Sequence, residues 1–151
     1  MTKRQMTKTP KSSELKLERS LRAPIQKVWR ALTRGEEIAR WFGPSDAFRV
    51  EVLEWDCRTG GGYRVAMHDP DGNTHTCFGT FEDVDEPDRL TYTWSWEGQP
   101  PMDTLVAFEL AEDGSATKLS FRHTGFPSDE ARDRHEQGWT GSLERLSRLV
   151  A

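Results

Sequence analysis

The sequence has few cysteines and no long apolar run. Its 151 residues include two cysteines, Cys57 and Cys77, and no CxxC motif. Neither a disulfide framework nor a zinc site is therefore indicated, and we expect a reducing, cytoplasmic location. No segment approaches the ~20 apolar residues of a membrane helix, so no membrane span is predicted. The N-terminal segment lacks the apolar stretch of roughly seven or more residues that a secretory signal needs.

Apolar residues are also scarce, at 34% of the chain. Six Trp and seven Phe nevertheless supply large surfaces to bury, which argues against disorder of the whole chain. The length suits one domain with its own core and is too short for two comfortable ones. We therefore predict a single domain over residues 14–151.

Charge is unevenly distributed along the chain. The net charge is −4, yet residues 1–13 contain four basic side chains and no acidic one. Removing these four positive charges from the total leaves −8 on residues 14–151. We predict that residues 1–13 form a disordered basic tail. An acidic body argues against nucleic acid as the main partner.

Local patterns predict one strand and then two short helices. Apolar residues alternate with polar ones over Glu14–Leu21, which is typical of a strand. Pro24 opens a helix that Gly35 follows. A second helix is predicted over Glu36–Phe42 and should end before Gly43-Pro44. The apolar stripe of the first helix consists of Ile25, Val28, Trp29 and Leu32.

From Phe48 onward the apolar residues recur with a period of two, which predicts half-buried antiparallel strands. Turn residues at Asp69–Asn73 and Asp113-Gly114 predict hairpins. With a helix on one face of such a sheet, the fold class is α+β with two layers. The predicted strands lie near 48–52, 63–67, His75–Val84, Leu90–Trp96, Thr104–Leu110 and Thr117–His123.

The last predicted helix, from about Ser128 to Val150, carries the most informative pattern. Its apolar residues share one arc, so this face lies on something apolar. Because the arc contains a His and a Trp, it can close either a solid core or a pocket with a polar handle. The arc consists of Ala131, His135, Trp139, Ser142, Leu143, Leu146, Leu149 and Val150.

His123 has the strand parity of Leu119 and Phe121, so its ring is expected to face the interior beside His135 and Trp139. A neutral imidazole there offers one hydrogen bond to a ligand. The structural alternative is that His123 bonds a neighbouring backbone group.

The sequence also bears on acid–base catalysis, metal binding and phosphate binding. An acid–base role for either histidine with a carboxylate such as Glu37 or Asp103 stays open. No metal site is predicted from His68, Asp69, Asp71 and His75, because turn chemistry explains the aspartates. The glycines at 60–62 lack a following helix, which favours a tight strand bend over a phosphate loop.

Several motifs, taken in order, resemble START-like proteins of the SRPBCC superfamily. Within it, the chain is most similar to homologues of the activator of the 90-kDa heat-shock protein ATPase. The motifs that carry the resemblance are Ala23-Pro24 with 28–33, Ala39–Pro44, Arg58 with Gly61–Arg64, Gly79–Glu82, Pro87–Trp94, His123–Phe126 and Gly138-Trp139.

The resemblance implies a helix-grip (START/Bet v-like) fold. In that fold a curved antiparallel sheet of about seven strands holds a long C-terminal helix, two short helices follow the first strand, and a cavity lies between sheet and helix. Members of the superfamily bind apolar molecules, and the aromatic content with the His/Trp face of the last helix favours non-enzymatic binding of a small hydrophobic or amphipathic ligand, without a cofactor. The predicted ligand-binding residues are Trp41, Tyr63, Trp94, Phe108, Phe121, His123, His135, Trp139 and Leu143.

Two alternatives stay open. Some superfamily members are cyclases, so a cyclase-like enzyme using a buried His is the first. The second is a co-chaperone-like interaction domain. In the eukaryotic co-chaperone a separate N-terminal domain drives chaperone binding, and 13 residues precede the domain here. We therefore rank chaperone stimulation below ligand binding. An exposed edge strand also makes a homodimer plausible.

Overall fold

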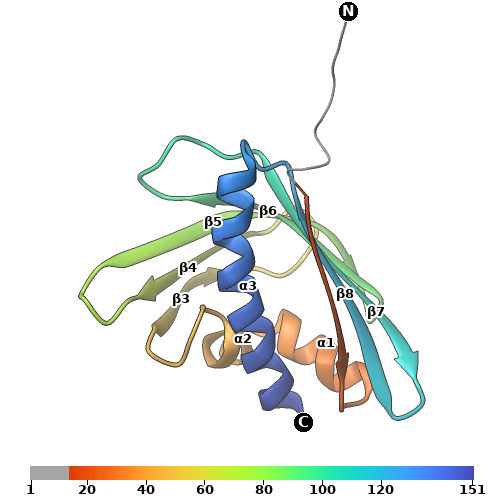
Figure 1. The fold of residues 1–151 in the computed structure, drawn as a ribbon. Coiled ribbons are helices and arrows are strands. Elements are labelled where there is room, and N and C mark those ends of the chain that lie inside the picture. The colour runs from red at the N-terminus through yellow and green to blue at the C-terminus, as the bar shows by residue number, and fades with distance from the viewer. Residues whose placement is uncertain (1–13) are drawn as a thin grey trace, which may run out of the picture.

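The computed structural model describes residues 14–151, and the predicted basic tail at residues 1–13 lies outside them. A seven-stranded antiparallel sheet has the order β2-β8-β7-β6-β5-β4-β3, and Figure 1 shows α3 lying across it. The predicted α+β fold of helix-grip type is confirmed. The elements are β2 Leu15–Leu21, α1 Ile25–Thr33, α2 Gly35–Trp41, β3 Arg49–Trp55, β4 Gly62–His68, β5 Thr74–Asp85, β6 Arg89–Trp96, β7 Thr104–Asp113, β8 Ala116–Thr124 and α3 Asp129–Val150.

The sheet joins the two ends of the domain and curves strongly. The first described strand, β2, pairs with the last strand, β8, placing Leu15 opposite His123. Irregular registers in β3 and β5 bend the strands locally. At Gly79 in β5 an added Cβ would overlap the Thr93 carbonyl of β6, so only glycine permits this approach.

The helices follow their sequence signals. Gly35 lies past the end of α1, as predicted, because α1 ends at Thr33. Gly35 also begins α2, one residue before the predicted start at Glu36, and Arg34 alone, in an extended conformation, separates α1 from α2. At the other end of the domain, Ser128 caps α3 by accepting a hydrogen bond from the Ala131 amide at 3.1 Å.

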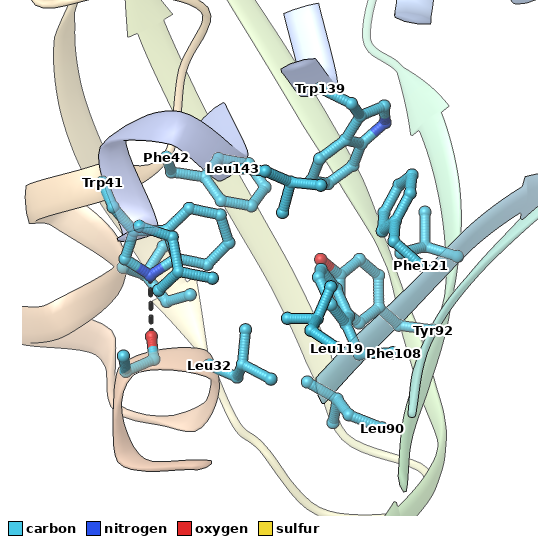
Figure 2. Packing of buried hydrophobic residues seen from close by; sticks show 14 of the residues in the cluster. Leu32, Trp41, Phe42, Leu90, Tyr92, Phe108, Leu119, Phe121, Trp139 and Leu143 are labelled. Atoms are coloured by element: carbon cyan, nitrogen blue, oxygen red, sulfur yellow. Dashed lines mark hydrogen bonds between the residues drawn. The ribbon is translucent and has the colours of Figure 1, made fainter. Parts of the chain in front are cut away.

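An aromatic core fills the space between the sheet and the helices (Figure 2). The Trp41 indole donates to the Ala31 carbonyl oxygen at 2.7 Å, the dashed line in Figure 2. The rings of Phe121 and Trp139 have centroids 4.5 Å apart, which brings β8 and α3 into direct contact. Within residues 14–151, no helix is both long and apolar enough to cross a membrane.

Candidate functional site

A pocket of about 720 Å³ lies beside the N-terminal half of α3. Its walls come from α3, the loop after α2, the ends of β4, β5 and β6, and the loop from 97 to 103 that joins β6 to β7. Figure 1 shows that loop beside the N-terminal end of α3. Small-molecule sites in proteins have volumes of about 300–1,000 Å³, so this pocket is of suitable size.

Aromatic rings that pack against one another form the inner wall of the pocket. Trp94 lies between Trp96 and Trp139, with ring centroids 5.3 and 5.2 Å away. Phe42 extends the wall, its centroid 5.7 Å from that of Trp139 in an edge-to-face arrangement. Such edge-to-face and tilted contacts are the preferred geometries for aromatic pairs. The wall is therefore apolar and held in place by its own contacts.

The loop after α2 is fastened to α3, which fixes a second wall. Ser142 donates to the Gly43 carbonyl at 2.8 Å, and Arg145 donates to the Phe42 carbonyl at 2.7 Å. Gly43 has φ +105°, a conformation that favours glycine. At Gly141 an added Cβ would overlap the Pro44 carbonyl oxygen. The absence of a side chain at Gly141 thus lets α3 and the loop touch.

His123 belongs to a closed hydrogen-bond chain behind this wall. The Trp139 indole N–H, which is a donor only, donates to His123 Nδ1 at 3.1 Å. The proton of the neutral ring is therefore assigned to Nε2, which donates to Thr104 Oγ1 at 2.9 Å. The Thr104 hydroxyl in turn donates to the Trp94 carbonyl at 2.6 Å. Both ring nitrogens of His123 are satisfied within the fold.

His135, at the pocket wall, is occupied in the same way. The Trp96 indole donates to its Nε2 at 2.9 Å, so the proton is assigned to Nδ1, which donates to the Ala131 carbonyl at 2.7 Å. Burial lowers the pKa of His135 and lowers the pKa of His123 well below 6.5, and a proton on His135 would lower the pKa of His123 further. Both rings are thus neutral links between elements.

The structure separates the predicted site residues into two groups. Trp94, His135 and Trp139 line the pocket. The other six lie in the core and are at most 1% exposed: Trp41, Tyr63, Phe108, Phe121, His123 and Leu143. The partners of His123 are the side chains of Trp139 and Thr104, where the structural alternative expected a backbone group.

Sequence reasoning missed several residues of the pocket wall. Trp96 shares the strand parity of Trp94, and this signal was available in the sequence. Pro100, Pro101 and Met102 belong to a loop without hydrophobic periodicity, so no pattern indicated that they face α3. Phe42 and Phe48 flank the turn after α2 and also line the pocket.

Other reactive groups are engaged or protonated. His68 bonds Glu51 and Thr74 at 3.1 and 2.9 Å, and His75 bonds Asp69 at 3.0 Å. No group of three metal-binding side chains occurs within the described part of the chain. Burial, with a smaller contribution from Asp56, raises the pKa of the Cys57 thiol to about 11, so it is not a thiolate at neutral pH.

A sheet wrapped around a long C-terminal helix, with a pocket beside that helix, defines a START-like domain. The chain belongs to the family described as "Activator of Hsp90 ATPase homolog 1-like protein", which matches residues 22–151. A search of the curated proteins found no match.

Solved structures share this fold over nearly the whole chain. Protein CV1439 from Chromobacterium violaceum is 29% identical, with a TM-score of 0.85 over 91% of this chain and 96% of that one. The AHSA1 protein SPO3351 from Silicibacter pomeroyi is 24% identical, with a TM-score of 0.81 and the same coverages. DynU16, from the dynemicin biosynthetic locus, is 24% identical, with a TM-score of 0.73 over 90% of this chain and 46% of that one.

Proposed function

We propose that this domain binds a small apolar or amphipathic molecule in the pocket beside α3, without chemical conversion. The observation that carries the proposal is a pocket of about 720 Å³ with an aromatic wall on a domain that is otherwise rich in charged residues. Burial of apolar ligand surface against such rings supplies roughly 25 cal/mol per Å² before the costs of association.

The occupied imidazoles favour binding over catalysis. A cyclase-like enzyme would need a ring nitrogen free to exchange a proton with substrate. Each nitrogen of His123 and His135 is already engaged by a protein group at 2.7–3.1 Å. Neither ring has a carboxylate among these partners, so the pairing with Glu37 or Asp103 that the sequence left open gains no support.

Trp94 supports a ligand with a hydrogen-bond acceptor. Its ring lines the pocket, and its Nε1 is a buried donor without a hydrogen-bond partner in residues 14–151. An unsatisfied buried donor costs about 1–3 kcal/mol. A ligand oxygen that reached this N–H would recover part of that cost, which adds polar selectivity to an apolar site.

The proposal is tested with the neutral probe N-phenyl-1-naphthylamine, whose fluorescence rises in apolar sites. We expect saturable binding to the wild-type protein. Gly138 lines the pocket, and an added Cβ there would meet no atom within 4 Å. Gly138→Leu should therefore fill the pocket and weaken probe binding at least about tenfold, whereas the matched variant Gly138→Ala should change it little. Absence of saturable binding to wild type would refute the proposal.

Two other roles remain predictions. The co-chaperone-like role is consistent with the family, and a pull-down with the host chaperone in the presence of nucleotide tests it. A homodimer through an edge strand of the sheet would use β2 or β3, the two outer strands. Sedimentation at several protein concentrations tests that prediction.

A further inference from the structure

The charges around the pocket differ from those of the domain. Residues 14–151 carry a net charge of −8, yet no Asp or Glu lines the pocket. Arg134 is the one Lys or Arg side chain among the described residues that line it. His75 also lines the wall, and it bonds Asp69 at 3.0 Å. The formal charge on the pocket wall is therefore positive and lies on the Arg134 side chain.

Arg134 lies at one end of a stripe along the pocket. Arg134, Gly138 and Ser142 are spaced four residues apart on α3, so they share one helix face, and all three line the pocket. At 1.5 Å per residue, this stripe is about 12 Å long. Ser142 at the far end is buried and bonded to the Gly43 carbonyl. A ligand along this stripe thus has a charged group of the protein at one end and a closed wall at the other.

The guanidinium of Arg134 is only weakly engaged by the protein. Its nearest acidic partner is Glu130, with Nη1 and Oε1 4.0 Å apart, and the two side chains are 68% and 84% exposed. An exposed pair at this distance contributes little. A ligand carboxylate or sulfonate can therefore compete for the guanidinium, whose planar fork suits such oxygens.

We propose that the pocket selects anionic amphipathic molecules, whose apolar body lies along α3 against Trp94 and Trp139 and whose acidic head binds Arg134 at the rim. This inference rests on the proposed function and names the class of ligand for the same site. A cationic amphipath finds no carboxylate among the described residues that line the pocket and meets the positive charge of Arg134. The selection comes from one charged side chain, so a single substitution tests it.

The test compares two probes with related bodies, 8-anilinonaphthalene-1-sulfonate and the neutral N-phenyl-1-naphthylamine. Arg134→Gln should weaken binding of the sulfonate about fivefold and change that of the neutral probe less than about twofold. Arg148→Gln is the matched control, because Arg148 is exposed on the same helix and lies outside the pocket. It removes the same charge and should change the ratio of the two dissociation constants less than about twofold.

The possible results distinguish failure of the anionic-head proposal from failure of the pocket proposal. If the neutral probe binds but Arg134→Gln leaves the ratio of dissociation constants unchanged, the anionic-head proposal is wrong and the pocket proposal survives. The same conclusion follows if the sulfonate still binds to Gly138→Leu, because the anion then binds elsewhere. If neither probe binds to wild type, both proposals fail. An equal loss in the Arg134 and Arg148 variants would assign the effect to net charge and would also overturn the selection by Arg134.

Discussion

The indole N–H of Trp139 donates to Nδ1 of His123 at 3.1 Å, and this bond joins α3 to β8 inside the core. Trp96 and His135 form an equivalent bond at the pocket wall, at 2.9 Å. In both pairs an indole, which can only donate, fixes the tautomer of the imidazole that accepts from it. Through these bonds the two histidines hold the helix on the sheet, while their role as polar groups of a ligand site stays a prediction.

A matched pair of Trp→Phe variants measures the buried bond. Both Trp139 and Trp94 are 4% exposed, but only Trp139 has a partner for its N–H. Trp139→Phe should lower the free energy of unfolding by about 1–3 kcal/mol more than Trp94→Phe, because it leaves His123 Nδ1 unpaired. Urea unfolding measures the difference. Equal losses in the two variants would show that the bond contributes nothing.

The protein should lose stability as the pH falls below about 6.5. Burial depresses the pKa of His123 in the folded state, so the unfolded chain takes up a proton first. This contribution to stability is fully present above the unfolded-state pKa. It is lost at up to about 1.4 kcal/mol per pH unit as the pH falls toward the folded-state pKa. Urea unfolding between about pH 7.5 and pH 5 measures the slope.

His135, whose pKa burial also lowers, acts in the same pH window, whereas the perturbed carboxylates act outside it. The hydrogen bond from His75 lowers the pKa of Asp69 from its ordinary value of 3.8. The hydrogen bond from Arg64 lowers the pKa of Glu97 from its ordinary value of 4.5. The contributions of Asp69 and Glu97 to the free energy of unfolding are lost at more acidic pH than the contribution of His123. The variant His123→Gln should show a shallower slope above about pH 5 whatever its absolute stability. A slope identical to that of wild type would contradict the assignment to His123.

Two glycines on α3 should respond in opposite directions to Ala. Gly138→Ala should stabilise the protein by about 0.5–1 kcal/mol, because a Cβ there meets open space and Ala favours the helix. Gly141→Ala should destabilise it by about 1–3 kcal/mol or more, because its Cβ would overlap the Pro44 carbonyl. Thermal unfolding distinguishes the two. If Gly138→Ala also destabilised the protein, the prediction that an added Cβ at Gly138 meets open space would be wrong.

Arg145 should contribute far more to stability than its neighbour Arg148. The Arg145 side chain is 12% exposed, donates to the Phe42 carbonyl at 2.7 Å and pairs with Asp46 at 3.0 Å. Arg145→Gln should cost about 1.5–3 kcal/mol. Arg148→Gln, at a position 62% exposed, should stay within about 0.5 kcal/mol. Chemical denaturation of the two variants measures this, and similar losses would contradict it.

Much of the fold could be predicted from hydrophobic periodicity. The alternation at Leu90, Tyr92 and Trp94 identified β6, and the helical arc through Trp139 identified α3. The ends of the longer strands were not evident, because polar residues such as Asp113 add no apolar signal. They pair through the backbone instead, as Asp113 does with Ala116 across the turn.

The pocket was harder to predict than the fold. Strand parity and helix arc indicate which side chains face inward, but not whether the space before them is filled. Phe121 and Trp139 face the same interior, and only their packing at 4.5 Å decides that no ligand lies between them. The loop from 97 to 103 completes the pocket through Pro100 and Met102, and no periodic signal marks its position.

The close contact between the backbones of Gly141 and Pro44 fixes one side of the pocket opening. Since helix and loop backbone meet there without an intervening side chain, that edge cannot widen unless α3 separates from the loop. The opposite edge is the loop with Pro100 and Pro101. Ser95 holds this loop at its base through Met102, and the Glu97 amide donates to the Thr76 carbonyl at 2.8 Å. A longer or shorter loop between β6 and β7 would therefore change the size of this pocket, while the core stays the same.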